Sequence, residues 1–240
     1  MSPLIIPILL VAVSLVYATV GQAGGTAFLA IMAVLGVPAA ELRPTALILN
    51  IVAAGYATWR LHAGGAIDWR LLTAAGAASL PASFLGGLVV LDSAIYYTLT
   101  GGIMLFAAAM LVTKWYVREA ISPGTVRAAI VGGLAGFASG ITGVGGGVFL
   151  APALIGLGWA TARQAAALSA PFILGNSITG LVGVLAAGQR PTADVGLYAF
   201  AALAGAIAGT MIGQRFMSER TTRYVLAAIL VIAGARLLVH

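Results

Sequence analysis

The chain has 240 residues, of which 61% are hydrophobic and only 8% are charged, and its mean hydropathy is +1.08. Soluble globular domains carry about 25% charged residues, so this composition excludes a soluble domain and indicates a protein embedded in a lipid bilayer. The net charge of +6 comes from basic residues scattered singly between apolar blocks, which excludes a nucleic-acid-binding surface. Because the chain contains no cysteine, disulfides, thiolate catalysis and cysteine metal sites are excluded as well.

The first half of the chain predicts a long apolar helix, a glycine-rich break, a short apolar segment and three further helices. The helix at 3–20 has no basic leader and runs into further apolar sequence, so we predict a helix of the mature protein and not a signal peptide. The short segment lies at 26–37, and the three helices lie at 41–61, 68–91 and 93–115. A turn-forming stretch at 121–124 ends this half.

The second half repeats this order, with a helix at 123–140, a short segment at 147–158 and helices at 161–187, 192–215 and 221–239. Residues 24–30 read GGTAFLA and match GGGVFLA at 145–151. Later landmarks follow in the same order, among them Arg43 with Arg163 and Asp68 with Asp194. The matches predict two repeats, residues 1–121 and 122–240, within one integral membrane domain.

The two short segments decide the predicted topology. A helix of twelve residues spans about 18 Å, which is too little to cross about 30 Å of hydrocarbon. Each short segment is therefore predicted to be one arm of a re-entrant or broken-helix hairpin, and each half crosses the bilayer three further times. This odd number predicts an all-α polytopic membrane protein built from two inverted repeats. The inverted topology places Arg43, Arg190 and Arg236 on one side and the other nine basic residues on the cytoplasmic side, with both termini opposite.

The glycine breaks are the predicted functional site. Irregular backbone at membrane depth must be buried in protein or line a polar cavity, because unpaired N–H and C=O groups cost several kcal/mol in hydrocarbon. Glycine adopts positive φ, and the short helix that follows directs free N–H groups and its positive dipole end towards the break. The pattern predicts an anion receptor whose central residues are Gly24, Gly25, Thr26, Gly145, Gly146 and Gly147. Other glycines are predicted to serve helix packing, namely Gly132, Gly133, Gly136, Gly205 and Gly209.

Polar residues near the breaks are the next candidates. They are predicted either to hydrogen-bond a bound oxyanion or to link helices, and both alternatives stay open. The residues are Gln22, Asn50, Thr142, Ser169, Asn176 and Ser177.

Charged residues receive smaller roles. Arg43 and Arg163 follow the short segments and are predicted either to attract an anion to the entrance or to anchor the protein at the membrane interface. Glu41 is the acid closest to a short segment and is the candidate for proton coupling. The two histidines lie at predicted helix ends without neighbouring ligands, so no metal site and no cofactor are predicted.

The glycine motifs also carry a family resemblance. GITGVGGGVFLAPALIGLG at 140–158, its fainter copy GQAGGTAFLAIMAVLGV at 21–37, and the later AIDWR resemble the TauE/SafE family of sulfite and organosulfonate exporters over nearly the whole chain. The resemblance implies transport of small sulfur-containing anions across the cell inner membrane. Thr26 stands where the family commonly has a third glycine and Ile31 where it commonly has proline, so the identity of the anion is left open.

The combined expectation is an exporter, not an enzyme, that binds sulfite, a sulfonate or a related oxyanion between two glycine tips. Its expected partners are this anion and the lipid bilayer, and a homo-oligomer is left open. The alternative is a non-transporting membrane assembly factor or a membrane-embedded enzyme. No Ser/His pair, acid pair or metal-ligand set in the sequence favours catalysis.

Overall fold

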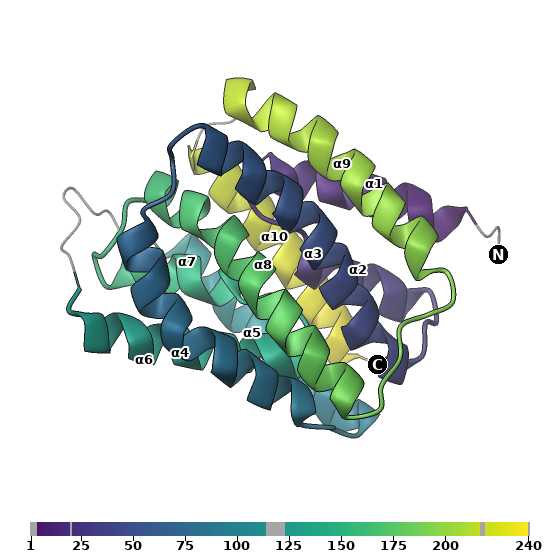
Figure 1. The fold of residues 1–240 in the computed structure, drawn as a ribbon. Helices are drawn as coiled ribbons and strands as arrows, with labels where there is room; N and C mark the ends of the chain where they lie inside the picture. The colour runs from purple at the N-terminus through teal and green to yellow at the C-terminus, as the bar shows by residue number, and fades with distance from the viewer. Residues whose placement is uncertain (1–3, 20, 114–122, 217–218, 240) are drawn as a thin grey trace.

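The computed structural model describes residues 4–19, 21–113, 123–216 and 219–239, which form ten α-helices (Figure 1). The first five are α1 (Ile5–Ala18), α2 (Gly25–Val34), α3 (Ala39–Ala63), α4 (Trp69–Leu88) and α5 (Ser93–Val112). The second five are α6 (Thr125–Thr142), α7 (Gly147–Gly156), α8 (Ala162–Ala186), α9 (Val195–Phe216) and α10 (Glu219–Leu238). Every predicted helix is confirmed, with ends within about one turn of the expected ones. The predicted boundary between the repeats, at 121 and 122, lies outside the described residues.

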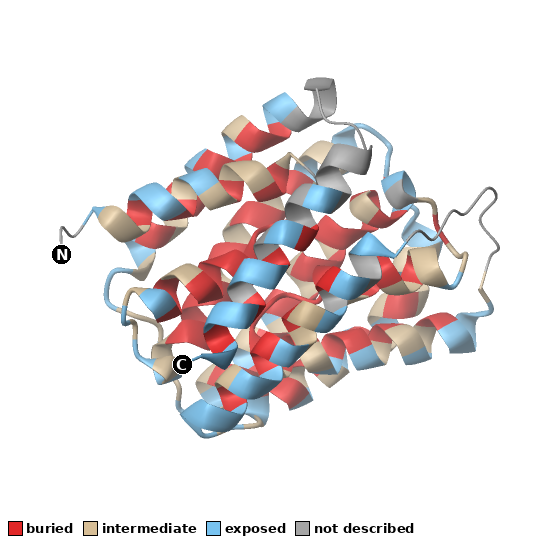
Figure 2. Cartoon of the chain, turned by 180° about the vertical axis from the view of Figure 1, so that it is seen from behind, coloured by how far each residue is buried: buried red, intermediate tan, exposed pale blue. Residues whose placement is uncertain are grey.

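The outer surface of the bundle is apolar. Val126 and Leu134 on α6 and Phe200 on α9 are 73%, 69% and 71% exposed, and Figure 2 shows exposed positions alternating with buried ones along the helices. Among the described residues, four segments are long and apolar enough to cross a membrane: Trp69–Leu88, Thr125–Thr142, Arg163–Ala186 and Val195–Ile212. Large apolar side chains on the outside of long helices are stable against lipid, so the chain is a multi-pass membrane protein.

Polar caps fix the starts of several helices. The Asp68 carboxylate accepts from the backbone N–H of Arg70 at 3.0 Å and of Leu71 at 3.1 Å, and Asp92 caps α5 through the N–H of Ile95 at 3.0 Å. Thr161 and Gln164 form a reciprocal capping box at the start of α8. The short helices α2 and α7 differ, because their caps are Gly24 and Gly146, which supply no side chain.

Glycines set the closest helix contacts. A Cβ added to Gly132, Gly136 or Gly140 of α6 would lie 2.1, 2.3 or 2.1 Å from a backbone carbonyl oxygen of α4, so these backbones touch. Gly205 and Gly209 of α9 meet α1 in the same way, at 2.3 and 2.1 Å. The predicted packing role is confirmed for the predicted members of this set. Gly133 is looser, because its added Cβ would make an ordinary 3.5 Å contact with Ala78.

The main helix pairs that pack between the two halves have counterparts in which the equivalent helices of the opposite halves pack together. Helix α4 packs on α6 and α8, while α9 packs on α1 and α3. Figure 1 shows α1 with α9 along one edge and α4 with α6 along the opposite edge, with α3 and α8 between them. Helices α4 and α6 are parallel, because Gly132, Gly136 and Gly140 meet α4 in chain order. Helices α5 and α10 are antiparallel, because Gly101 meets Leu238 while Gly234 meets Leu105.

Candidate functional site

The two breaks form two glycine tips, which we define as residues 21–25 and 143–147. Gly24 and Gly146 are the N-caps of α2 and α7 and have φ of +102° and +82°, values that side-chain-bearing residues rarely adopt. Gly143 and Gly145 add two further positive φ values, +78° and +91°, in the second tip. The backbone N–H of Phe28 donates to Gly24 at 2.9 Å and that of Leu150 donates to Gly146 at 3.0 Å. The N–H groups of Ala27 and Phe149 donate to the same two carbonyls at 3.0 Å. The backbone N–H groups that precede Ala27 and Phe149 in each first turn point out of the helix towards its tip.

The first and second tips lie against each other. A Cβ added to Gly25 would lie 2.4 Å from the Val144 carbonyl oxygen and 2.5 Å from Nδ2 of Asn50. Asn50 is the twelfth of 25 residues in α3, so the tips meet near the middle of this helix. The contact leaves no room for even one added carbon atom, so the two tips are closed on each other.

Three fully buried side chains around the second tip have polar atoms without a hydrogen-bond partner: Oδ1 of Asn50, Oγ of Ser139 and Oγ of Ser177. The amide Nδ2 of Asn50 donates a long bond of 3.3 Å to Gly143. A Cβ added to Gly145 would lie 3.0 Å from this Nδ2 and 3.1 Å from Oγ of Ser177. Asn50 on α3 and Ser177 on α8 therefore converge on one glycine at the start of α7.

The other predicted polar residues already have partners inside the bundle. Thr26 shares a 2.5 Å hydrogen bond with the Tyr17 hydroxyl. Thr142 and Ser169 donate to carbonyls one turn earlier on their own helices, at 2.7 and 2.8 Å. Asn176 accepts from Ser79 at 2.5 Å and donates to Phe172 at 2.8 Å, which links α4 to α8. Thr26 and Asn176 therefore link neighbouring helices, whereas the hydroxyls of Thr142 and Ser169 are satisfied within their own helices.

Gln22 is a buried residue of the first tip, with 6% of its surface exposed. Its backbone N–H donates to the Tyr17 carbonyl at 3.0 Å, which closes the end of α1. Glu41 lies in the first turn of α3 and is partly exposed, two helical turns or more from Asn50.

The two arginines occupy different environments. Arg163 is exposed on the first turn of α8. Arg43 is only 1% exposed and donates to four backbone carbonyls, so it lies in the interior and not at an entrance or membrane interface as expected. The pairing of Arg43 with Arg163 is also wrong, because Arg43 is the fifth residue of α3 and the fifth residue of α8 is Ala166.

The alignment of the two tips shifts by one residue in the structure. The sequence match paired Gly25 with Gly146, whereas the helix starts pair Gly24 with Gly146 and Gly25 with Gly147. Thr26 then corresponds to Val148, and the missing third glycine of the first tip is at position 23, where alanine stands opposite Gly145. The shift arises because the N-cap, which requires positive φ, fixes the register more strongly than the apolar residues that follow.

Ser139 was not predicted as a site residue. It lies on the last turns of α6, and a Cβ added to Gly146 would be 3.2 Å from its Cβ. The signal available in the sequence was its position one turn before Gly143, the left-handed residue that ends α6.

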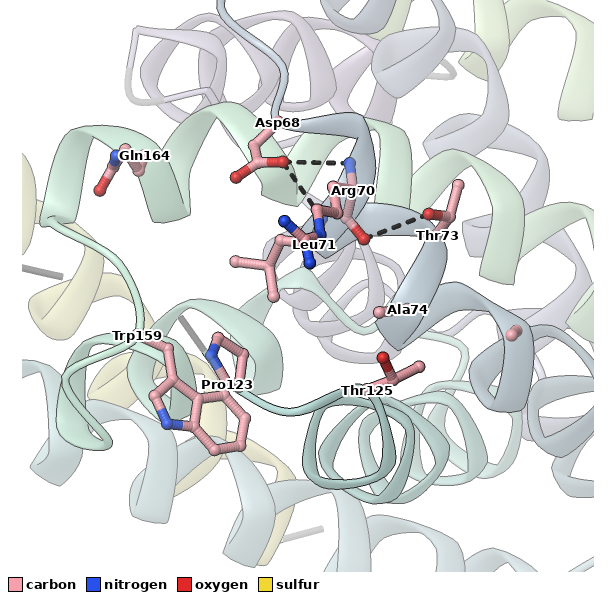
Figure 3. A pocket seen from close by; sticks show the side chains of 10 residues that line it. Asp68, Arg70, Leu71, Thr73, Ala74, Pro123, Thr125, Trp159 and Gln164 are labelled. Atoms are coloured by element: carbon pink, nitrogen blue, oxygen red, sulfur yellow. Dashed lines mark hydrogen bonds between the residues drawn. The ribbon is translucent and has the colours of Figure 1, made fainter. Parts of the chain in front are cut away.

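A surface pocket of about 510 Å³ lies away from the tips, at the end of the bundle where α4, α6 and α8 begin. Figure 3 shows Asp68 and Arg70 on one side of it, Trp159 and Pro123 on the other, and Gln164 nearby. Pro123 precedes α6 and Trp159 follows α7, so the chain returns after the second tip to the end from which α6 began. The α6–α7 segment is thus a broken-helix hairpin. The apolar cluster that includes Leu150, Leu168 and Phe172 separates the pocket from the tip.

A bundle of long apolar helices, with two glycine tips that meet inside the protein among buried polar groups, is the architecture of a membrane transporter. The family model "Sulfite exporter TauE/SafE" matches residues 6–237, and the chain belongs to this family. The chain is 34% identical over 232 residues to "Probable membrane transporter protein y4hK" of Sinorhizobium fredii (strain NBRC 101917 / NGR234), covering 94% of each chain. No solved structure matches the chain.

Proposed function

We propose that this transporter exports a small sulfur-containing oxyanion, such as sulfite or an organosulfonate, across the cell inner membrane. The observation that carries the proposal is the set of three buried, unpartnered polar atoms of Asn50, Ser139 and Ser177 at the start of α7. An unpartnered buried polar atom costs about 1–3 kcal/mol, so a protein retains such groups where a ligand supplies their partners. The substrate class comes from the family description.

The chemistry of the second tip suits an oxyanion. The two serine hydroxyls donate hydrogen bonds, and the first-turn N–H groups of α7 add donors and the positive end of a helix dipole. Oδ1 of Asn50 accepts a hydrogen bond, which a bisulfite O–H or a taurine ammonium group would donate. The proposed site therefore favours anions that carry both oxygen acceptors and one donor.

The closed tips require a moving step. Since Gly25 and Val144 leave no space between them, a ligand enters only when the first and second tips separate. We propose that the halves 1–121 and 122–240 are inverted repeats that rock against each other and expose the tips to each side in turn. Support comes from the corresponding helix pairs of the two halves and from the antiparallel arrangement of the equivalent helices α5 and α10.

The proposed orientation follows from charge. Arg70, Arg127 and Arg163 lie on the first turns of α4, α6 and α8, which all begin at the pocket end of the bundle. The positive-inside rule assigns this end to the cytoplasm. The pocket then forms a cytoplasmic vestibule, with Arg163 next to its lining residue Gln164 as an entrance charge.

Purified protein in liposomes tests the proposed function. Anion flux and binding are measured at neutral pH for sulfite, sulfate, thiosulfate, taurine and methanesulfonate, of which sulfate, thiosulfate and methanesulfonate have no donor for Asn50. We expect the native protein to move at least one of the sulfur anions without a protein partner. Absence of both binding and flux for all of them would refute the proposal and favour the assembly-factor alternative.

A matched pair of variants tests the location of the site. Asn50→Leu keeps the branched shape of the side chain and removes its polar atoms, so binding should be lost. Gly133→Ala adds one carbon where an ordinary 3.5 Å contact with Ala78 is available, so it should bind and transport as the native protein does. If Asn50→Leu bound the anion with native affinity, the binding site would not be at the tips.

A further inference from the structure

Arg43 is the one charged side chain among the buried residues that the structure describes. Its Nη1 donates to the carbonyl of Val89 at 2.7 Å, and its Nη2 donates to Gly87 at 3.0 Å, Gly86 at 3.3 Å and Gly140 at 2.9 Å. Its Nε is buried without a partner. The guanidinium group thus closes the C-terminal end of α4 and ties it to α6 with backbone acceptors alone.

The four carbonyl oxygens accept hydrogen bonds from the Arg43 guanidinium group but do not neutralise its positive charge. The end of a helix carries about half a negative elementary charge, whereas a guanidinium carries one full positive charge. A buried, incompletely compensated cation is costly in a membrane protein, and such residues commonly serve the transported ion.

The position of Arg43 connects this charge to the second tip. A Cβ added to Gly143, the first residue of that tip, would lie 3.2 Å from Cα of Arg43. Asn50 follows Arg43 on α3 by seven residues, which is two turns and a rise of about 10 Å on the same side of the helix. All four hydrogen bonds of the guanidinium group go to backbone carbonyls, so the fixed charge lies behind the tip, where it can attract a ligand beside Asn50.

We propose that Arg43 is a positioning residue whose field selects anions at the second tip, in place of the entrance role expected from the sequence. The inference rests on the proposed function and deepens it. At about 10 Å and an effective dielectric constant of about 20, one positive charge strengthens binding on the order of tenfold for each negative charge on the ligand. The first tip has no such charge, because Ala166 occupies the equivalent position beside Gly21.

The test compares two anions of different charge, methanesulfonate with one negative charge and sulfate with two. In Arg43→Gln the affinity should fall on the order of tenfold for methanesulfonate and a hundredfold for sulfate. Arg43→Lys keeps the charge and loses the four-carbonyl geometry, so it should melt at a lower temperature but keep the native ratio of the two affinities. Equal losses for both anions in Arg43→Gln would show a purely structural role and overturn the inference.

A second pair of variants decides the question if Arg43→Gln does not fold. The Tyr96 hydroxyl donates to Thr142 at 2.8 Å, at the same end of α6 that Arg43 contacts. Tyr96→Glu places a negative charge near Arg43 while leaving its four bonds, and Tyr96→Gln is its neutral match. We expect the selective loss of sulfate affinity in Tyr96→Glu and not in Tyr96→Gln; identical affinities in the two variants would overturn the inference. If the native protein binds neither anion nor any other in the panel, the proposed function itself fails.

Discussion

Replacing Ser177 by alanine should make the protein more stable while weakening anion binding. Oγ of Ser177 is fully buried and has no partner, so the native fold bears the desolvation cost of this hydroxyl, about 1–3 kcal/mol. Deleting the hydroxyl removes that cost but also removes the van der Waals contacts of one buried atom. The free energy of unfolding should therefore rise by about 1 kcal/mol.

Ser14 provides the matched control. It is also fully buried, but its Oγ donates to the carbonyl of Ala202 at 2.6 Å and links α1 to α9. Ser14→Ala removes a satisfied hydrogen bond and should lower stability by about 1 kcal/mol. A change of 1 kcal/mol shifts the melting temperature of a chain of this size by about 2–4 °C. Ser177→Ala should therefore melt about 2–4 °C above the native protein and Ser14→Ala about 2–4 °C below it.

The assay is melting temperature in detergent, with and without the best-bound anion from the liposome screen. A hydrogen bond to a charged group contributes about 1.5–3 kcal/mol, so Ser177→Ala should lose about tenfold to a hundredfold in affinity, and Ser14→Ala should lose none. If Ser177→Ala melts below the native protein and binds the anion normally, Ser177 is a structural residue and the reasoning from unpartnered atoms is refuted.

Three further predictions concern the tips, the entrance and the topology. Gly25→Ala forces a carbon atom against a backbone carbonyl oxygen of the second tip, so it should destabilise the protein by about 1–3 kcal/mol. Gly133→Ala should change stability by less than about 0.5 kcal/mol. Equal melting temperatures of the two variants would show that the tips are not in contact. Arg163→Gln should reduce initial transport rates several-fold at low ionic strength and little at high ionic strength, and a salt-independent loss would exclude a steering role. A reporter after the C-terminal residue should lie outside the cytoplasm and a tag between α5 and α6 inside it, and finding both on one side would exclude the inverted repeats.

Local sequence was sufficient for the helices and for the nature of the tips. Apolar run length fixes how far a segment reaches in the bilayer, and the capping residues Asp68, Asp92 and Thr161 act on N–H groups two or three positions away. Gly24 and Gly146 were recognisable because a left-handed residue before a helix is a property of the backbone at that position. These features depend on neighbours along the chain, so the sequence alone determines them.

The roles of the polar side chains were decided by contacts between distant segments. Asn176 and Ser177 are neighbours in the sequence, but a helix turns by about 100° between them, so that one meets Ser79 on α4 and the other faces the second tip. Nothing local distinguishes them, and both were predicted alike.

Arg43 shows the same limit most clearly. An arginine that follows a short apolar segment has the sequence pattern of a membrane-interface anchor, and Arg163 occupies an exposed position of that kind. Only the tertiary structure brings the end of α4 and the carbonyl of Gly140 to Arg43 and makes it a buried charge behind the second tip. The sequence by itself determined the membrane class, the helices and the two glycine tips, because these follow from composition and local backbone preference. The tertiary structure decided which side chains serve packing and which are left to meet a ligand, because hydrogen-bond partners come from segments far apart in the chain.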